Sequence, residues 1–281
     1  MYLEFYGLRE FPFGLTPDTG FFFADESRRG ALETLRFALE TGEGFIKISG
    51  EVGTGKTTLC RYFLQDLGPE YISAYILNPQ LEPRELLQAV AQELSLKLDQ
   101  RLGSHRALQA INTALLQHAE AGHRVLLLID EAQALPTESL EAVRLLSNLE
   151  TEKRKLLQII LFGQPELDTR LDQPEIRQLK QRIAFSYALR PMTLAETAAY
   201  IEHRLRLAGY RGGNLLQPGA LKLLHRASRG IPRLINLLSH KALLAAYGRG
   251  LRQVSRRELL QALNDTPQAH AVGFWRRLTA F

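Results

Sequence analysis

The first two thirds of the chain alternate short apolar runs with stretches in which apolar residues recur at helical spacing. Leu32, Leu35 and Leu39, for example, lie on one face of a predicted helix. The apolar runs have the length of buried strands, and they lie at 45–49, 71–77, 125–130, 157–162 and 185–189. Because strands that alternate with helices favour a parallel sheet covered on both faces, we predict an α/β fold with a five-stranded parallel sheet.

The pattern changes at Pro191, after which only helices are predicted. Two of them begin with capping boxes, Thr193 with Glu196 and Ser255 with Glu258. We therefore expect a small all-helical domain after the α/β domain. The predicted parts are an N-terminal arm at 1–24, the α/β domain at 25–190, the helical lid domain at 191–265 and a tail at 266–281.

The N-terminal arm is rich in aromatic side chains, which proline and glycine interrupt. Phe11 and Phe13 flank Pro12, and three phenylalanines follow Gly20. Such a segment cannot form a regular helix, so we expect an ordered arm that packs on the α/β domain that follows it.

The tail ends in a segment, 274–281, that mixes aromatic and basic residues. It could dock on a membrane surface or on a partner. The simpler interpretation, which we favour at so short a length, is a frayed end that packs on the helical domain.

Composition and charge describe a globular protein with a core. Of the 281 residues 45% are hydrophobic and 23% are charged, and the formal net charge is +5. This mild excess permits contact with nucleic acid or an anionic membrane, but ordinary solvated surface charge explains it more simply.

A single cysteine, Cys60, excludes an internal disulfide framework and is expected in the core. Nothing at the N-terminus resembles a signal peptide, and the longest aliphatic run, 125–129, is too short to span a bilayer. We therefore expect a cytoplasmic protein whose membrane link, if any, comes through a partner. The seven histidines are scattered, so no structural zinc site is predicted.

The segment between the first predicted strand and the next helix fits the phosphate-binding pattern G-x-x-x-x-G-K-[ST]. Its residues are Gly50, Glu51, Val52, Gly53, Thr54, Gly55, Lys56 and Thr57, followed by Thr58. The glycines let backbone N–H groups surround phosphates, and the helix N-terminus adds partial positive charge. Lys56 is expected to reach the β- and γ-phosphates and Thr57 to ligate Mg²⁺, with Thr58 in a lesser role, so ATP and Mg²⁺ are the predicted cofactors.

A second motif lies at 125–131, where a buried strand ends in Asp130 and Glu131. A strand that ends in acidic residues is often only a solvated turn, but here a phosphate-binding loop precedes it. Asp130 is expected to hold Mg²⁺ through water, and Glu131 to polarise the attacking water as a general base.

In the chain, the predicted strand 71–77 lies between these two motifs. This extra strand and the Glu beside Asp130 resemble the ATPase branch that includes AAA+ and RecA-like proteins. By that resemblance Gln164, at the end of the fourth strand, is the candidate for sensor 1, which contacts the γ-phosphate or the water. The alternative is a polar residue in a strand-ending turn.

The same resemblance implies three functional arginines. Arg177 and Arg182 precede the fifth strand, where AAA+ proteins carry an arginine finger that enters the neighbouring subunit's ATP site; Arg182 is slightly favoured. For either one, a solvated helix-face arginine is an equal alternative. Arg233 follows Gly230 in the sensor 2 pattern G-x-x-R, from which it would reach the γ-phosphate.

Further segments point to one family. They are 2–8 (YLEFYGL), 12–13 (PF), 16–18 (TPD), 42–46 (GEGFI), 130–133 (DEAQ) and 162–167 (FGQPEL). Together they resemble the ExeA/GspA-type AAA+ ATPases of general secretion, and the similarity covers essentially the whole chain. The length of the chain, and the lack of a membrane span and a peptidoglycan-binding domain, make the chain most similar to the members of this family that serve MSHA pilus biogenesis.

The family resemblance implies an AAA+ module that forms homo-oligomers and powers assembly of a type IV pilus or a type II secretion system. Its partners would be assembly proteins at the inner membrane. Pro17 and Asp18 of the arm would lie near the adenine. Relatives often have a histidine where this chain has Arg28 and Arg29.

Two alternatives share the predicted ATP site. A DNA-acting AAA+ ATPase, such as a transposition or replication helper, fits the mild basicity and the arginine-rich stretch 249–257, but no helix-turn-helix follows the lid. A nucleotide-gated adaptor that barely hydrolyses ATP fits poorly with Glu131 and the candidate arginine fingers.

Overall fold

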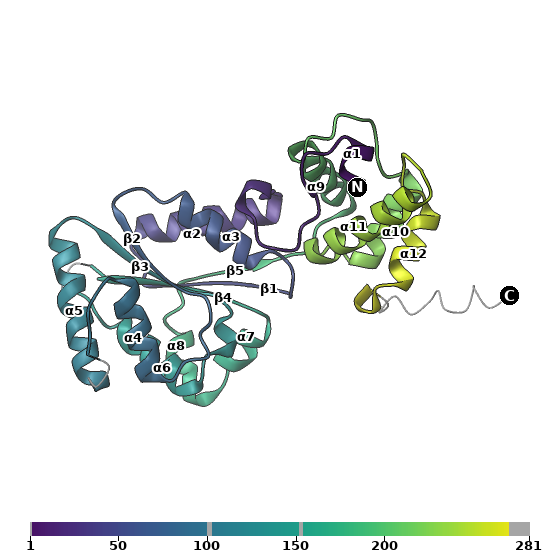
Figure 1. Cartoon of the computed structure of the whole chain (residues 1–281). Coiled ribbons are helices and arrows are strands. Elements are labelled where there is room, and N and C mark those ends of the chain that lie inside the picture. The colour runs from purple at the N-terminus through teal and green to yellow at the C-terminus, as the bar shows by residue number, and fades with distance from the viewer. Residues whose placement is uncertain (1, 100–102, 152–153, 270–281) are drawn as a thin grey trace. The chain divides into compact units, whose positions relative to one another are not determined.

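The computed structural model describes residues 2–99, 103–151 and 154–269 (Figure 1). The chain forms two compact units. The helical unit contains the described residues within 1–25, 53–55 and 190–281, and the α/β unit contains those within 26–52 and 56–189.

The α/β unit is built on the predicted five-stranded sheet, and all of its paired strands are parallel. The strands are β1 (Phe45–Gly50), β2 (Tyr71–Ile76), β3 (Arg124–Ile129), β4 (Leu157–Gly163) and β5 (Phe185–Leu189). Their spatial order is β2-β3-β4-β1-β5. The strand that separates β1 from β3 in space is thus β4, whereas the strand predicted at 71–77 lies at an edge of the sheet.

Helices cover both faces of this sheet (Figure 1). On one face lie α2 (Glu26–Thr41) and α3 (Lys56–Gln65). On the other lie α4 (Pro83–Glu93), α5 (Ser104–Glu120), α6 (Thr137–Leu146), α7 (Glu166–Leu171) and α8 (Arg177–Lys180). Every residue of β4 is buried, which explains why this strand is a continuous apolar run. Cys60 of α3 is fully buried, as predicted.

Short 3₁₀ turns complete the α/β unit. They are η2 (Ala132–Ala134) and η3 (Pro174–Ile176). The sequence pattern did not predict any element between β4 and β5, where α7, η3 and α8 follow one another within a few residues.

The helical unit contains α9 (Leu194–Leu207), α10 (Pro218–Ser228), α11 (Pro232–Gly248) and α12 (Arg256–Asn264), with η4 (Pro267–Ala269) after them. The capping boxes predicted for α9 and α12 are both present. A shared apolar core joins these helices to the N-terminal arm. Within it, α11 packs against α10 and α12.

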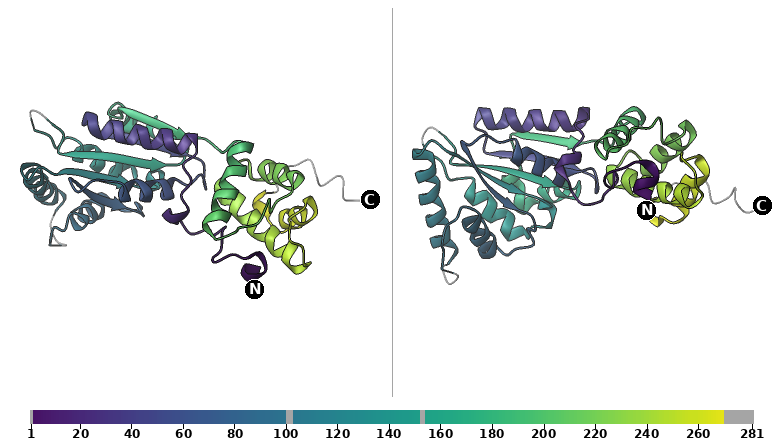
Figure 2. Two further views of the ribbon diagram at one scale, coloured as in Figure 1. Left: turned by 90° about the horizontal axis from the view of Figure 1, so that it is seen from above. Right: turned by 45° about the horizontal axis from the view of Figure 1, so that its top comes forward.

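The N-terminal arm packs on the helical unit, so the expectation that it packs on the α/β domain is wrong. Tyr2, Tyr6, Phe13 and Phe21 of the arm are buried in the core of the helical unit. The arm also contains α1 (Tyr2–Tyr6), which lies against α11 (Figure 2), and η1 (Thr19–Phe21). A short helix therefore forms where the proline and glycine residues are absent.

Polar contacts fix the arm in place. The Tyr6 hydroxyl donates to the Leu251 carbonyl at 2.9 Å, and the Asn236 amide donates to the Gly14 carbonyl at 3.1 Å. Arg204 is buried, donates to the Pro12 carbonyl, and its guanidinium carbon lies 4.6 Å from the centre of the Phe21 ring. Packing on the helices removes the aromatic side chains of the arm from water. The Pro12 and Gly14 carbonyls of the arm accept hydrogen bonds from the helical unit.

Among the described residues, no helix is both long and apolar enough to cross a membrane. The segment 274–281, for which a docking role and a frayed end are the two interpretations, lies outside the described residues.

Candidate functional site

The phosphate-binding loop connects the end of β1 with the start of α3. Gly53 and Gly55 have φ angles of 80° and 92°, a conformation that only glycine adopts at little cost. Thr54 is fully buried, while Glu51 and Val52 are exposed. The loop sequence therefore forms the strand–turn–helix connection that the motif requires.

Lys56, the first residue of α3, is held under the loop. It is 4% exposed, and its ammonium donates to the Gly50 carbonyl at 2.8 Å and to the Glu51 carbonyl at 3.2 Å. Burial lowers the pKa of Lys56 below its ordinary value, against the opposite effect of Glu131 and Asp130. A buried ammonium that has no ion pair within the described structure is suited to an anionic ligand.

Asp130 lies at the end of β3 and is fully buried. The Thr57 hydroxyl donates to its Oδ2 at 2.6 Å, and the Glu131 N–H donates to its Oδ1 at 2.9 Å. Burial raises the pKa of Asp130 above its ordinary value, while the hydrogen bond from Thr57 lowers it. The structure thus brings together the two residues that the sequence assigned to Mg²⁺.

Tyr75 is a neighbour of Asp130 that the sequence analysis missed. It comes from β2, which pairs with β3, and its hydroxyl donates to Asp130 Oδ2 at 3.3 Å. Burial raises the pKa of Tyr75, so the phenol stays protonated and remains a donor. A tyrosine in an apolar strand gives no signal of this contact, because the contact depends on which strands are adjacent.

Glu131 follows Asp130 in a left-handed backbone conformation, with φ 51° and ψ 38°. Its Oε2 accepts from the Gln133 amide at 2.6 Å and from the Gln164 amide at 2.8 Å. The Gln164 backbone N–H in turn donates to Gln133 Oε1 at 3.0 Å. Gln164, predicted at the end of the fourth strand, therefore lies beside Glu131. Gln133 belongs to the family segment 130–133, but nothing in the sequence alone marks it as a partner of Glu131.

Arg182, the favoured candidate for the arginine finger, lies away from Asp130 and Glu131 of its own chain. It lies three residues before β5, hence at the amino edge of the parallel sheet, whereas Asp130 follows the carboxyl end of β3. Its guanidinium donates to the Ser147 hydroxyl at 3.1 Å. Arg177 begins α8.

The remaining predicted residues belong to the helical unit. Arg233 is the second residue of α11. Asp18 caps η1, and its Oδ1 accepts from the Gly20 N–H at 2.8 Å; Pro17 precedes it. Their roles at ATP stay predictions, as do those of the loop residues, including Thr58 in the first turn of α3.

Comparisons with known proteins first define the class. Residues 39–171 match the family described as "AAA domain". Among solved structures, the ORC2 protein of Aeropyrum pernix is 19% identical with a TM-score of 0.65, covering 89% of this chain and 72% of its own. Cdc6p of Pyrobaculum aerophilum is 18% identical with a TM-score of 0.68, covering 88% and 70%. These likenesses concern the fold, and with the sheet order and the loop they confirm the predicted AAA+ P-loop NTPase fold with a helical region after it.

A curated relative is closer in sequence. The General secretion pathway protein A of Aeromonas hydrophila is 43% identical over 276 residues, which is 98% of this chain and 50% of the relative. The resemblance to the ExeA/GspA-type proteins is confirmed at this level, while the nearer placement in the MSHA pilus branch stays a prediction. The chain spans about half the length of this relative.

Proposed function

We propose that this protein binds and hydrolyses ATP in order to drive assembly of a bacterial cell-envelope machine. One observation carries the catalytic part: Lys56, the Thr57–Asp130 pair and the Glu131 carboxylate converge at one edge of the sheet. Lys56 and Thr57 come from the phosphate-binding loop and Asp130 and Glu131 from the end of β3, and together they supply chemistry that phosphoryl transfer to water requires.

The residues present fit a magnesium ion. The Thr57 hydroxyl and the Asp130 carboxylate are the two groups that would hold Mg²⁺, and they already lie 2.6 Å apart. Within the described part of the chain no three His, Cys, Asp or Glu residues form a metal cluster. This agrees with Mg²⁺, which usually keeps waters and phosphate oxygens as its other ligands. Bound there, the ion would neutralise charge on the phosphates.

The protein groups around ATP then have separate tasks. Lys56 and the backbone N–H groups of residues 50–57 hold the phosphates. Glu131 accepts a proton from the attacking water, and the Gln133 and Gln164 amides fix the accepting carboxylate. In this proposal Gln164 also senses the γ-phosphate, as does Arg233 from α11, and Pro17 and Asp18 lie near the adenine.

The site is completed by a second copy of the chain. Because Arg182 lies at the opposite edge of the sheet from Asp130, it can serve an ATP site only in a neighbouring subunit. Arg177 is the second candidate for this finger. The proposal therefore includes a homo-oligomer in which each ATP lies at a subunit interface.

The biological role rests on the relative. A protein named General secretion pathway protein A is 43% identical to this chain over 276 residues, which is 98% of this chain and 50% of that protein. We infer that the machine is a type II secretion system or an MSHA-type pilus, and that the partners are its assembly proteins at the inner membrane.

Two substitutions test the catalytic part. The Lys56→Ala protein should lose nucleotide binding, measured with a fluorescent ATP analogue. The Glu131→Gln protein should bind ATP but hydrolyse it roughly 100-fold or more slowly, measured by phosphate release. Equal ATP affinity for Lys56→Ala and wild type, or unchanged turnover for Glu131→Gln, would contradict the assigned roles.

The same variants test the partners. Glu131→Gln protein held with ATP should retain inner-membrane secretion or pilus assembly proteins on an affinity column, and Lys56→Ala protein should not. If ATP-bound Glu131→Gln protein instead retains double-stranded DNA at physiological salt, the DNA-acting alternative replaces the envelope role.

A further inference from the structure

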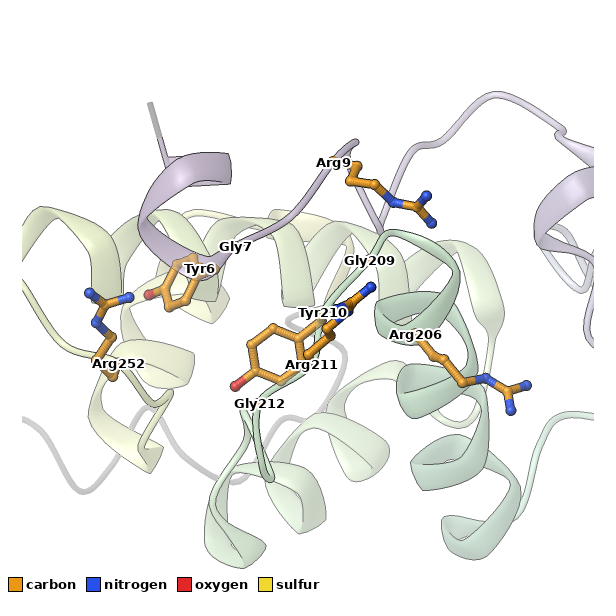
Figure 3. A pocket seen from close by; sticks show the side chains of 9 residues that line it. All are labelled: Tyr6, Gly7, Arg9, Arg206, Gly209, Tyr210, Arg211, Gly212 and Arg252. Atoms are coloured by element: carbon orange, nitrogen blue, oxygen red, sulfur yellow. The ribbon is translucent and has the colours of Figure 1, made fainter.

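A basic pocket opens on the helical unit (Figure 3), and none of the residues that line it is assigned to ATP. It lies between the N-terminal arm, the end of α9 with the loop that follows it, and the segment between α11 and α12. Its volume is about 780 Å³. It is lined by Tyr6, Gly7, Arg9, Arg206, Gly209, Tyr210, Arg211, Gly212 and Arg252.

The charges of the pocket have one sign. Four of its lining residues are arginines, and none is acidic. Arg206 and Arg211 are exposed, and in the described structure neither forms an ion pair. Glu258, the carboxylate whose charge acts on Tyr6, is already bound by Arg249 and by Ser255. Because no carboxylate neutralises the arginines, the pocket favours an anionic ligand.

Two of the arginines are held in place by the backbone. Arg9 donates to the Leu207 carbonyl at 3.3 Å. Arg252 donates to the Phe5 carbonyl, and its guanidinium carbon lies 4.2 Å from the centre of the Phe5 ring. A guanidinium fixed in this way keeps N–H groups free for a phosphate at a small cost in side-chain entropy.

Two glycines provide the space that the Arg9 and Tyr210 side chains occupy. Gly209 has a φ of +91°, and a Cβ there would lie 2.7 Å from Arg9 Nε. A Cβ on Gly212 would lie 2.4 Å from the Tyr210 hydroxyl. The positions of Arg9 and Tyr210 thus depend on the absence of a side chain at two places in one short loop.

An aromatic ring lies among the charges. In the view of Figure 3 the Tyr210 ring lies on the side of the pocket that faces Arg252, whose charge acts on Tyr210, while the Arg206 side chain points away from the ring. Tyr210 is half-buried, and burial raises its pKa, so it presents a neutral ring. A flat ring in a pocket lined by four arginines matches a ligand that alternates planar groups with phosphates.

We propose that this pocket binds a short segment of single-stranded nucleic acid. The arginines contact backbone phosphates, and the Tyr210 ring stacks on a base. The volume suits one or two nucleotides, since pockets for ligands of that size measure roughly 300–1,000 Å³. A lipid headgroup would use the arginines but would leave the ring without a planar partner.

The first test measures binding of a fluorescein-labelled oligothymidylate of about 12 nucleotides by anisotropy across a salt series. Wild-type protein should bind with an affinity that falls as salt rises. The Arg206→Ala/Arg211→Ala protein should bind roughly 10-fold more weakly, and the slope of log affinity against log salt should lose about 1.4, or about 0.7 for each lost phosphate contact.

A matched control variant distinguishes the loss of contacts in the pocket from a general loss of positive charge. Arg226→Ala/Arg257→Ala removes the same charge from exposed residues of the helical unit that do not line the pocket. It should change the affinity by less than about 3-fold. Equal losses for the two double variants would overturn the proposal.

Tyr210 supplies the second test. Tyr210→Leu should weaken binding roughly 5- to 100-fold with an unchanged salt slope, whereas Tyr210→Phe, which keeps the ring, should bind like wild type. Thermal unfolding of each variant shows whether it is folded. No loss for folded Tyr210→Leu protein would remove base stacking from the site.

Two further outcomes would contradict the proposed nucleic-acid site. No binding of the oligonucleotide by wild-type protein at about 50 mM salt would overturn the proposal. So would binding to vesicles of phosphatidylglycerol and phosphatidylcholine that depends on Arg206 and Arg211 while the oligonucleotide does not bind. The pocket is distinct from the residues assigned to ATP, so its failure would leave the proposed ATPase activity untouched.

Discussion

At the scale of single residues, Glu131 combines backbone strain with a tightly held side chain. A left-handed conformation at a residue other than glycine costs on the order of 1–3 kcal/mol, and Glu131 has φ 51°. Two amides, from Gln133 and Gln164, donate to one oxygen of its carboxylate. The second oxygen is left for other partners, which is the arrangement expected of a carboxylate that accepts a proton from water.

Gln133 is therefore predicted to be a positioning residue for Glu131. Gln133→Leu removes one of the two amide donors, so the carboxylate is held less firmly. A hydrogen bond to a charged group contributes about 1.5–3 kcal/mol, and we expect kcat to fall roughly 10- to 100-fold while KM changes little. Steady-state phosphate release measures both constants.

A surface substitution serves as the control. Gln117→Leu makes the same chemical change at an exposed position of α5 and should leave both constants near wild type. A rise in KM for Gln133→Leu without a fall in kcat would place Gln133 in nucleotide binding and not in the support of Glu131.

At the scale of elements, the first turn of α9 depends on one carboxylate. The Glu196 carboxylate accepts from the Arg190 guanidinium at 2.7 Å and from the Thr193 backbone N–H at 2.8 Å. The hydrogen bond from Arg190 is the main cause that lowers the pKa of Glu196 to about 2, against the opposing effect of burial. Glu196 thus fixes the start of α9 to the segment that follows β5.

The lowered pKa predicts a pH dependence of stability. Because the pKa is lower in the folded protein than the ordinary value of 4.5, the stabilisation is present above pH 4.5 and is lost as the pH falls towards 2. At neutral pH, Glu196→Gln should lower the free energy of unfolding by about 1–2 kcal/mol. Urea unfolding at several pH values should show this difference shrinking between pH 5 and pH 2. A difference that stays constant over this range would show that the charge of Glu196 does not stabilise α9.

At the scale of the whole molecule, the parts that the sequence predicted are those with a local signature. Buried parallel strands are continuous apolar runs, and the phosphate-binding loop has a fixed spacing around Lys56. Both can be recognised without knowing what lies beside them. The five-stranded sheet and the phosphate-binding loop follow from such patterns, whereas the AAA+ fold was predicted from the resemblance to a known family.

Features that depend on contacts between distant segments were not predictable. The aromatic composition of the arm indicates that the arm is buried. It does not indicate that the arm packs in the core of the helical unit, because that depends on contacts between segments far apart in the chain. The contact of Tyr75 with Asp130 depends on the pairing of β2 with β3. The basic pocket joins residues as far apart in the chain as Arg9 and Arg252.

The position of Arg182 leads to a prediction about the assembly. If the finger acts in a neighbouring subunit, Lys56→Ala and Arg182→Ala proteins should each be inactive alone, for different reasons. When they are mixed in equal amounts, about a quarter of the interfaces combine an intact Lys56 with an intact Arg182. Phosphate release by the mixture should therefore recover to about a quarter of the wild-type rate, and should rise with protein concentration. An inactive Arg182→Ala protein that is not rescued would place Arg182 in the fold of its own subunit, where it binds Ser147. An active Arg182→Ala protein would direct the same mixing experiment to Arg177.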